Sequence, residues 1–231
     1  MTPIQPKLTR FKDATWLGNE EPCIIGGAGG ISSWLTLMLA RANFMPVVYD
    51  FDMLEEHNLG GQLFPFSGIG KPKVTVLADV VKQFSGVEIW QMNEKYTIGS
   101  MTGEFVFSGF DNMKARQDMF SAWVKFVTTE AEDKSKCIYI DGRLLAEQMQ
   151  IFCIRGNEPD RIAEYTADHL FSDEEVADGP CTMKQTSHAA AMIASFMTGY
   201  FTNHIHNIRT GTTTRFIPFS HEYFIPLDLF T

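Results

Sequence analysis

A short strand, a glycine-rich turn, an amphipathic helix and a second strand follow one another over residues 22–50. The segment "PCIIG" is typical of a buried strand that ends in glycine. Apolar residues then recur at helical spacing from Trp34 to Ala42, and "PVVYD" is typical of the next strand. Parallel strands joined by a helix require a right-handed crossover. This unit therefore indicates an α/β fold.

Three glycines in the turn, Gly27, Gly29 and Gly30, belong to the sequence G-A-G-G-I-S, which is close to G-x-G-x-x-G with Ser32 in place of the last glycine. Small residues let the backbone approach a phosphate, and the start of a helix offers N–H donors and a positive dipole. Asp50 lies 23 residues after Gly27, where an acid can accept hydrogen bonds from ribose hydroxyls. The pattern alone fits NAD, FAD or ATP, and it also fits a tight turn without a ligand.

The alternation of strands and helices continues along the chain. Helical patterns cover 73–84, 112–129 and 187–203, and strand patterns cover 86–93, 103–110, 137–145 and 147–156. Two later segments, 213–219 and 222–228, are predicted to form closing β structure. We therefore predict a Rossmann-like α/β fold, with a mostly parallel sheet flanked by helices and additional β structure near the C-terminus.

Charge and cysteine usage exclude several classes of protein. The net charge is −9, which argues against a nucleic-acid surface, because phosphate backbones attract basic proteins. No apolar run is long enough for a membrane span, and residues 1–16 lack the apolar core of a signal peptide, so we expect a cytoplasmic protein. The four cysteines form no C-x-x-C pair, so no zinc is expected, and most should be small buried residues.

The residues after Asp50 distinguish between the nucleotides. They form a D-x-D pair at Asp50 and Asp52, the segment "NLGGQ" from Asn58 to Gln62, the segment "GKPK" that ends at Lys73, and "DNMKAR" from Asp111 to Arg116. In this order the motifs resemble those of the ThiF/MoeB family, which includes the adenylating domains of ubiquitin-activating enzymes. The resemblance covers residues 22 to about 150 and extends more weakly to about 200.

The resemblance implies that residues 1–231 form a single adenylation domain. Residues 1–21 are an N-terminal extension, 22–150 the nucleotide-binding core and 181–231 a C-terminal helix and strands. Residues 155–180 carry eight acids and two arginines, which suggests a solvated excursion. In relatives, a crossover loop that covers the bound substrate tail occupies this place.

The resemblance also implies ATP-dependent adenylation of a carboxylate, usually the C-terminal glycine of a small ubiquitin-like or sulfur-carrier protein, with release of pyrophosphate. Lys73 would contact the phosphates and Asp111 would hold Mg²⁺, since a hard cation prefers carboxylate oxygen. Cys181 resembles a cysteine that accepts an acyl group or sulfur in some relatives. The residues implied to bind ATP are Gly27, Gly29, Gly30, Asp50, Asp52, Asn58, Gln62 and Lys73.

Each of these roles has a structural alternative. Asp50 and Asp52 could begin a loop, Asn58 could be a turn residue, and Asp111 could cap the helix that follows it. Lys73 could be a surface lysine and Cys181 a structural thiol. Arg116 is expected on the surface of its helix or behind the catalytic residues.

One departure from the family pattern bears on activity. Relatives carry a phosphate-contacting arginine where this chain has Gly61. Lys71 or Arg10 could supply the missing charge, and otherwise the enzyme would be slow or inactive. A catalytically weak partner subunit, or adenylation of a peptide or a modified tRNA nucleoside, is therefore an alternative, although the net charge of −9 counts against tRNA. Nicotinamide chemistry explains neither "HNLGGQ" nor "IGKPKV". Relatives pair near the nucleotide site, so a homodimer is expected.

Overall fold

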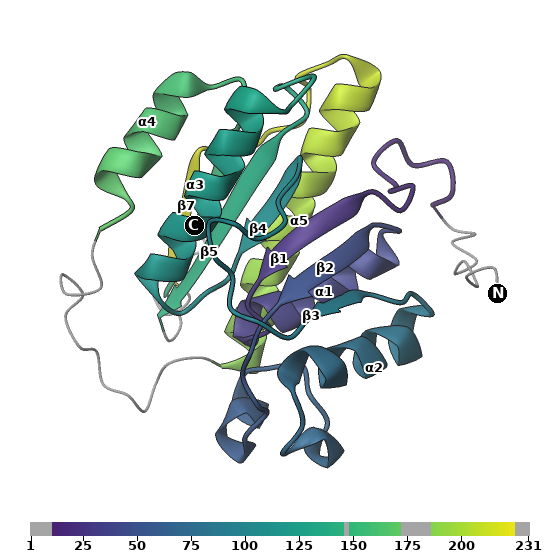
Figure 1. Ribbon diagram of the computed structural model, residues 1–231. Coiled ribbons are helices and arrows are strands. Elements are labelled where there is room, and N and C mark those ends of the chain that lie inside the picture. The colour runs from purple at the N-terminus through teal and green to yellow at the C-terminus, as the bar shows by residue number, and fades with distance from the viewer. Residues whose placement is uncertain (1–10, 146–147, 172–185, 225–231) are drawn as a thin grey trace.

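The computed structural model describes residues 11–145, 148–171 and 186–224. A seven-stranded sheet runs through the centre of the molecule in the order β3-β2-β1-β4-β5-β6-β7 (Figure 1). The chain starts near the middle of the sheet at β1, moves outward to β3, and returns to the other side of β1 at β4. The strand order therefore reverses between β1 and β4, and ligands of open α/β sheets usually bind at such a point.

The strands on the β3 side are parallel and those on the β7 side are antiparallel. Their bounds are β1 Pro22–Gly26, β2 Met45–Tyr49, β3 Trp90–Met92, β4 Phe105–Ser108, β5 Ile138–Leu145, β6 Gln148–Arg155 and β7 Ser220–Phe224. In the centre, Ile24 pairs with Val47 of β2 and with Val106 of β4. The parallel strands thus place their carboxyl ends along one edge of the sheet.

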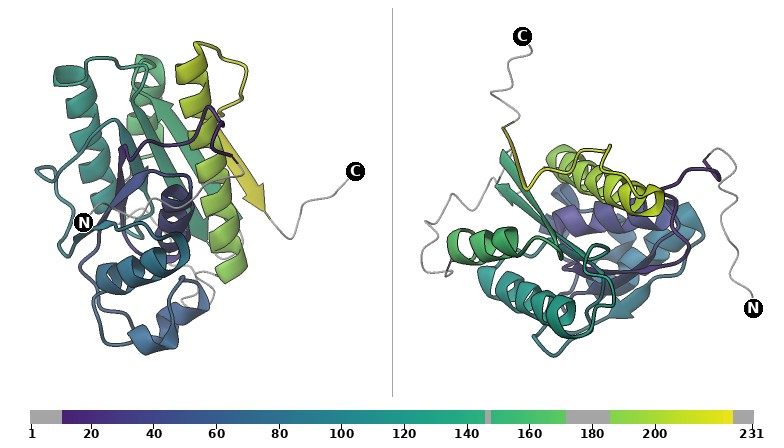
Figure 2. Two further views of the ribbon diagram at one scale, coloured as in Figure 1. Left: turned by 90° about the vertical axis from the view of Figure 1, so that its right-hand side faces the viewer. Right: turned by 90° about the horizontal axis from the view of Figure 1, so that it is seen from above.

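The helices form one layer on each face of the sheet (Figure 2). One layer contains α1 (Gly30–Arg41), α2 (Lys73–Ser85) and α5 (Ser187–Thr210), and the other contains α3 (Met113–Thr129) and α4 (Pro159–Asp168). Two short 3₁₀ helices, η1 (Glu56–Gly60) and η2 (Phe66–Gly68), lie between β2 and α2. In the part of the chain that the structure describes, no helix has the length and apolar character needed to cross a bilayer.

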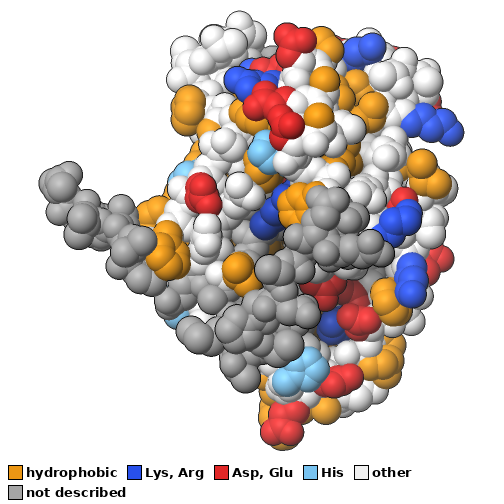
Figure 3. Space-filling view, turned by 90° about the vertical axis from the view of Figure 1, so that its left-hand side faces the viewer, with side chains coloured by type: hydrophobic (Ala, Val, Ile, Leu, Met, Phe, Trp, Pro, Cys, Tyr) orange, Lys and Arg blue, Asp and Glu red, His pale blue; other side chains and the backbone are white. Residues whose placement is uncertain are grey.

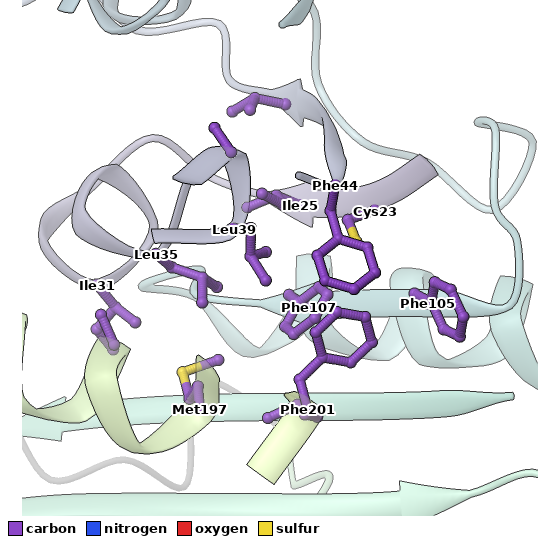
Figure 4. Packing of buried hydrophobic residues seen from close by; sticks show 14 of the residues in the cluster. Cys23, Ile25, Ile31, Leu35, Leu39, Phe44, Phe105, Phe107, Met197 and Phe201 are labelled. Carbon is purple, nitrogen blue, oxygen red and sulfur yellow. The ribbon is translucent and has the colours of Figure 1, made fainter. Parts of the chain in front are cut away.

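Two apolar cores lie between the sheet and these layers. Beneath α1 and α5, Phe201 packs against Phe44 and Phe107 with ring centroids 4.7 and 5.0 Å apart (Figure 4). Beneath α3 and α4, Phe120, Trp123 and Tyr165 form a second cluster with strand residues. The sheet is therefore covered on both faces, which leaves its carboxyl edge open for a site.

The predicted Rossmann-like fold is confirmed, and three details differ from the sequence expectations. First, β5 and β6 form an antiparallel pair, because only two residues separate Leu145 from Gln148 and a parallel crossover needs about a dozen or more. Second, among the described residues the closing β structure is β7, and 213–219 is not a strand, while 225–228 of the other predicted strand lies outside the described part of the chain.

The third difference concerns the acidic segment 155–180, which was expected to be a solvated excursion. Residues 159–168 instead form α4, which begins at Pro159. Ile162 and Tyr165, spaced by about one helical turn, pack onto the core under α3. The rest of the segment after residue 171 lies outside the described residues, as does Cys181, which follows the segment.

Candidate functional site

A cavity of about 630 Å³ opens at the carboxyl edge of the sheet, where the strand order reverses. Its walls come from the glycine turn, the ends of β2 and β3, the 55–73 region and the start of α3. Asp111 and all of the residues predicted to bind ATP line this one cavity. The sequence therefore identified residues that the fold brings together, while their roles stay predictions.

The glycine turn forms the floor of the cavity. Gly27 has a φ of +82°, in the left-handed region that favours glycine. Gly29 is extended, with φ −76° and ψ −157°, and precedes the first residue of α1. A Cβ atom built on Gly29 would meet no atom within 4 Å, so its position faces open space. The turn thus places the backbone of Gly29, which no side chain covers, beside a helix N-terminus, an arrangement that favours anions.

Asp50 holds the turn in place from the end of β2. Its two carboxylate oxygens accept hydrogen bonds from the backbone N–H groups of Ala28, at 2.7 Å, and Asp52, at 2.8 Å. Burial raises the pKa of Asp50, and these two donors act in the opposite direction. Each oxygen keeps a lone pair that can accept a hydroxyl hydrogen. Asp50 is therefore both a turn-stabilising residue and a candidate ribose ligand.

Lys73 is the first residue of α2 and is buried, so it is not an ordinary surface lysine. The Lys73 backbone N–H donates to the carbonyl of Asp52 at 2.9 Å, which closes the 52–73 excursion. The Lys73 Nζ lies 2.8 Å from an Asp52 carboxylate oxygen, and the Lys73 side chain is only 8% exposed, against 47% for Asp52. A phosphate that enters the cavity would compete with Asp52 for this ammonium group.

Asn58 and Gln62 come from η1 and the turn after it. The Asn58 side-chain oxygen accepts from the Glu55 N–H at 2.9 Å, so Asn58 does shape the turn, as the structural alternative proposed. It also lines the cavity. The Gln62 Oε1 atom is buried with no hydrogen-bond partner among the described residues. A buried oxygen without a donor is costly, so Gln62 is suited to a ligand hydroxyl or a bound water.

Gly61 brings no charge to the cavity, and its carbonyl accepts from the Trp34 indole N–H at 3.3 Å. Lys71, which was considered as a replacement for the family arginine, is not among the lining residues, and Arg10 lies outside the described residues. The lining cations besides Lys73 are Lys95, Lys114 and, when protonated, His57.

Asp111 follows β4 and is exposed to the cavity. It is not the cap of α3, because the side chain of Asn112 accepts the N–H of Ala115 at 2.9 Å and performs that role. Asn112 also donates to one Asp111 oxygen at 3.3 Å. In the described ranges, no group of three or more His, Cys, Asp or Glu side chains could hold a metal ion by itself. A cation here would need oxygen ligands from a substrate.

The loop after β3 also reaches the cavity, although no sequence motif marks it. Glu94, Lys95, Tyr96 and Thr97 all line the cavity, and the Lys95 Nζ lies 4.6 Å above the ring of Phe51. The available signal was positional, because this polar segment follows a parallel strand that ends at the same edge as β1, β2 and β4. Of the two positions expected for Arg116, the structure shows the second, since Arg116 is buried and does not line the cavity.

One face of the surface carries charges of both signs, and the described cysteines are as composition predicts. On the face shown in Figure 3, lysines and arginines are scattered among acidic and hydrophobic side chains. Cys23, Cys137 and Cys153 are buried, as predicted for most of the cysteines.

Comparison with solved structures shows that the fold is shared with several proteins at low sequence identity. PaaA has 16% identity and a TM-score of 0.60, over 89% of this chain and 64% of PaaA. MccB from E. coli, solved with ATP, has 14% identity and a TM-score of 0.59, over 83% of this chain and 58% of MccB. The chain therefore spans less than two thirds of both proteins.

A third structure matches over almost its whole length. The E. coli tRNA N6-threonylcarbamoyladenosine dehydratase TcdA has 11% identity and a TM-score of 0.63, over 88% of this chain and 93% of TcdA. In sequence, the model of the ThiF family matches residues 17–224, which include the glycine turn, Asp50, Lys73 and Asp111. The chain belongs to the ThiF family.

Proposed function

We propose that the chain binds ATP in this cavity and adenylates a carboxylate. The observation that carries the proposal is the convergence of the glycine turn, Asp50, Lys73 and Asp111 on one cavity at the carboxyl edge of the sheet. Bound ATP supplies the chemistry: a carboxylate oxygen attacks the α-phosphorus, the bond to the bridging oxygen breaks, and pyrophosphate leaves. The protein's part in such a reaction is to position groups and to stabilise charge.

The residues divide this work by their position. Asp50 accepts hydrogen bonds from the ribose hydroxyls with the lone pairs that Ala28 and Asp52 leave free. Gly29 lets the phosphates approach the N–H groups at the start of α1, because no side chain fills the open space beside it. Lys73 exchanges Asp52 for a phosphate oxygen and places a buried positive charge against it.

Magnesium fits the Asp111 side of the cavity. Mg²⁺ is usually bound by one or two carboxylates together with water and substrate phosphates, so a single exposed carboxylate is a sufficient protein ligand. Asp111 supplies that carboxylate, and Asn112 orients it from one side. The cation would offset negative charge on the phosphates. Asp118 also lines the cavity, but it is paired with Lys114.

For the acceptor we propose the C-terminal glycine of a small ubiquitin-like or sulfur-carrier protein. Adenylation of a peptide or another small carboxylate is the alternative, and the solved complex of MccB with N-formylated MccA is consistent with a small macromolecular substrate. We also propose that the chain forms a homodimer and acts in the cytoplasm. A covalent role for Cys181 stays a prediction, because this residue lies outside the described part of the chain.

A catalytically weak partner subunit is a second candidate function. Gly61 favours it, because the carbonyl at this position binds Trp34 and no side chain extends toward the phosphates. Removal of one comparable transition-state stabiliser typically costs about 2.7–4 kcal/mol. Lys73 and Asp111 both face the cavity and favour the active enzyme.

Pyrophosphate exchange into ATP tests the proposal when it is run with candidate carrier tails that end in glycine. Asp111→Asn removes the charge of the proposed magnesium ligand, and Asp79→Asn, on the exposed side of α2, is the matched control. We expect exchange to be lost in the first variant and retained in the second. ATP binding without exchange for any tail would favour the partner subunit, and a wild-type protein that binds no ATP would refute the proposal.

A further inference from the structure

A buried cluster of charged residues lies directly behind the loop that carries Asp111. Asp141, near the middle of β5, is 0% exposed, and both of its oxygens are bound. Arg116 of α3 binds one oxygen, while Arg143 at 2.7 Å and the Tyr165 hydroxyl at 2.9 Å bind the other. Burial alone would raise the pKa of Asp141, but the two arginines outweigh burial and hold its pKa below the ordinary value.

Arg116 reaches beyond this ion pair to the backbone of the loop. Its guanidinium donates to the carbonyl of Phe110, the residue before Asp111, and to the carbonyl of Gly142 at 3.2 Å. The Arg116 side chain is 8% exposed and does not line the cavity. The Arg116 guanidinium thus connects α3 to β5 and to the backbone of Phe110, directly before Asp111.

The other side of Phe110 packs against Gly26, the last residue of β1, directly before the glycine turn. A Cβ atom on Gly26 would come within 2.3 Å of the Phe110 ring, so the ring packs where Gly26 has no side chain. The N–H of Gly109 donates to the carbonyl of Gly26 at 3.1 Å. The loop 109–111 is therefore fixed on one side to the end of β1, where the glycine turn starts, and on the other side to the Arg116 guanidinium.

Stability alone does not account for this arrangement. Desolvation of a buried ion pair offsets much of its attraction, and well-packed apolar residues often stabilise a core as well or better. Arg143 already neutralises Asp141, so the second arginine adds a buried positive charge. What Arg116 adds is a planar set of donors that binds a carboxylate and two carbonyls together, which the point charge of lysine cannot reproduce.

We propose that Arg116, oriented by Asp141, is a positioning residue that fixes the distance between the Asp111 carboxylate and the glycine turn. The proposal rests on the proposed function, because this distance affects binding only if Asp111 and the glycine turn hold the same magnesium–triphosphate. Arg116 acts through the Phe110 carbonyl and does not touch the nucleotide.

The test is the effect of Mg²⁺ on ATP binding, measured by titration calorimetry with and without the cation. In Arg116→Lys we expect the ATP affinity without Mg²⁺ to equal that of the wild type. The factor by which Mg²⁺ increases ATP affinity, here called the gain from Mg²⁺, should fall about 10–100-fold, as for other groups that orient metal ligands. In pyrophosphate exchange, kcat should fall more than the KM for ATP rises. A purely structural role would lower thermal stability without changing the gain from Mg²⁺.

Arg143→Lys is the matched control, because Arg143 binds the same carboxylate but does not contact the Asp111 loop. It should lose stability and keep the wild-type gain from Mg²⁺. Should Arg116→Lys not fold, Asp141→Asn keeps the shape of the cluster and removes the charge that orients Arg116, with a loss of about tenfold expected.

The outcomes separate the two proposals. The positioning role is overturned if Arg116→Lys keeps the wild-type gain from Mg²⁺, or if Arg143→Lys loses as much of that gain as Arg116→Lys. The proposed function still stands in either case as long as the wild type binds ATP. A wild-type protein that does not bind ATP overturns both.

Discussion

Replacing Gly29 by alanine should weaken ATP binding without weakening the fold. The backbone at Gly29, with φ −76° and ψ −157°, is open to alanine, and the added Cβ would meet no atom within 4 Å. Loss of backbone freedom in the unfolded chain favours alanine by about 0.4–1 kcal/mol. Alanine is also a poorer N-cap residue than glycine, by an amount of roughly the same size. The free energy of unfolding should therefore change by less than about 1 kcal/mol.

The same methyl group would occupy the space through which a phosphate approaches the start of α1. A hydrogen bond to a charged group contributes about 1.5–3 kcal/mol, so loss of one N–H to phosphate contact predicts binding weaker by about 10- to 150-fold. Calorimetric titration of ATP with Mg²⁺ measures the affinity, and urea unfolding of the same sample measures stability.

Gly199→Ala in α5 is the matched control, because its added Cβ also meets no atom within 4 Å. In a helix interior this change should stabilise the protein by about 0.5–1 kcal/mol and leave ATP affinity unchanged. If Gly29→Ala binds ATP as tightly as the wild type, the backbone at Gly29 is not a phosphate-binding surface and the assignment of the turn is wrong.

Two further predictions follow from buried titratable groups. Burial lowers the pKa of His204 from 6.5 to about 4, so the unfolded chain binds the extra proton and stability is lost as pH falls through this window. The loss should be about 3 kcal/mol, and urea unfolding of His204→Gln between pH 7 and pH 4 should show a flatter profile. Burial likewise raises the pKa values of the Cys23, Cys137 and Cys153 thiols, so iodoacetamide at pH 8 should leave all three unmodified in the native protein, as mass spectrometry of peptides can show. Rapid alkylation of any of them before unfolding would contradict the packing of the sheet.

The site residues that could be predicted from sequence are those that follow a recognisable strand at a short or fixed distance along the chain. Gly29 and Asp50 lie at fixed intervals from a strand that is visible in the pattern, and Asp111 directly follows another such strand. Parallel strands end at one edge of the sheet, so residues that follow different strands must meet there. The position of such a residue in the sequence therefore predicts that it lines the cavity, even when its side-chain contacts are unknown.

The same reasoning could have predicted two features that were missed. Glu94 and Lys95 follow β3 just as Asp50 follows β2, but they match no motif. The antiparallel pairing of β5 with β6 is fixed by the two residues between them, which cannot form a crossover. In both cases chain geometry was a better guide than composition or motif. The acidic segment 155–180 is a similar case. Its high charge favoured a loop, although Pro159 and the spacing of Ile162 and Tyr165 are signals of a helix.

The contacts of Arg116 could not be read from the sequence, because its partners are brought together only by the fold. Asp141 is 25 residues away on another element, and the Phe110 carbonyl is a backbone group that no sequence pattern displays.

The charge of the cavity is also determined by residues that only the fold brings together. Five carboxylates, from Asp50, Asp52, Glu94, Asp111 and Asp118, face three ammonium groups, from Lys73, Lys95 and Lys114, and only some of these residues belong to the recognised motifs. A bound triphosphate would add further negative charge to this set, and Gly61 supplies no positive charge where the family pattern implies an arginine. Like charges repel strongly in a partly desolvated site. Under the proposed function, a divalent cation at Asp111 would therefore carry more of the phosphate neutralisation than it would beside an arginine at position 61. If the chain binds ATP as proposed, we therefore expect the position of Asp111, and of Arg116 behind it, to affect ATP binding more strongly in this chain than in one with an arginine at position 61.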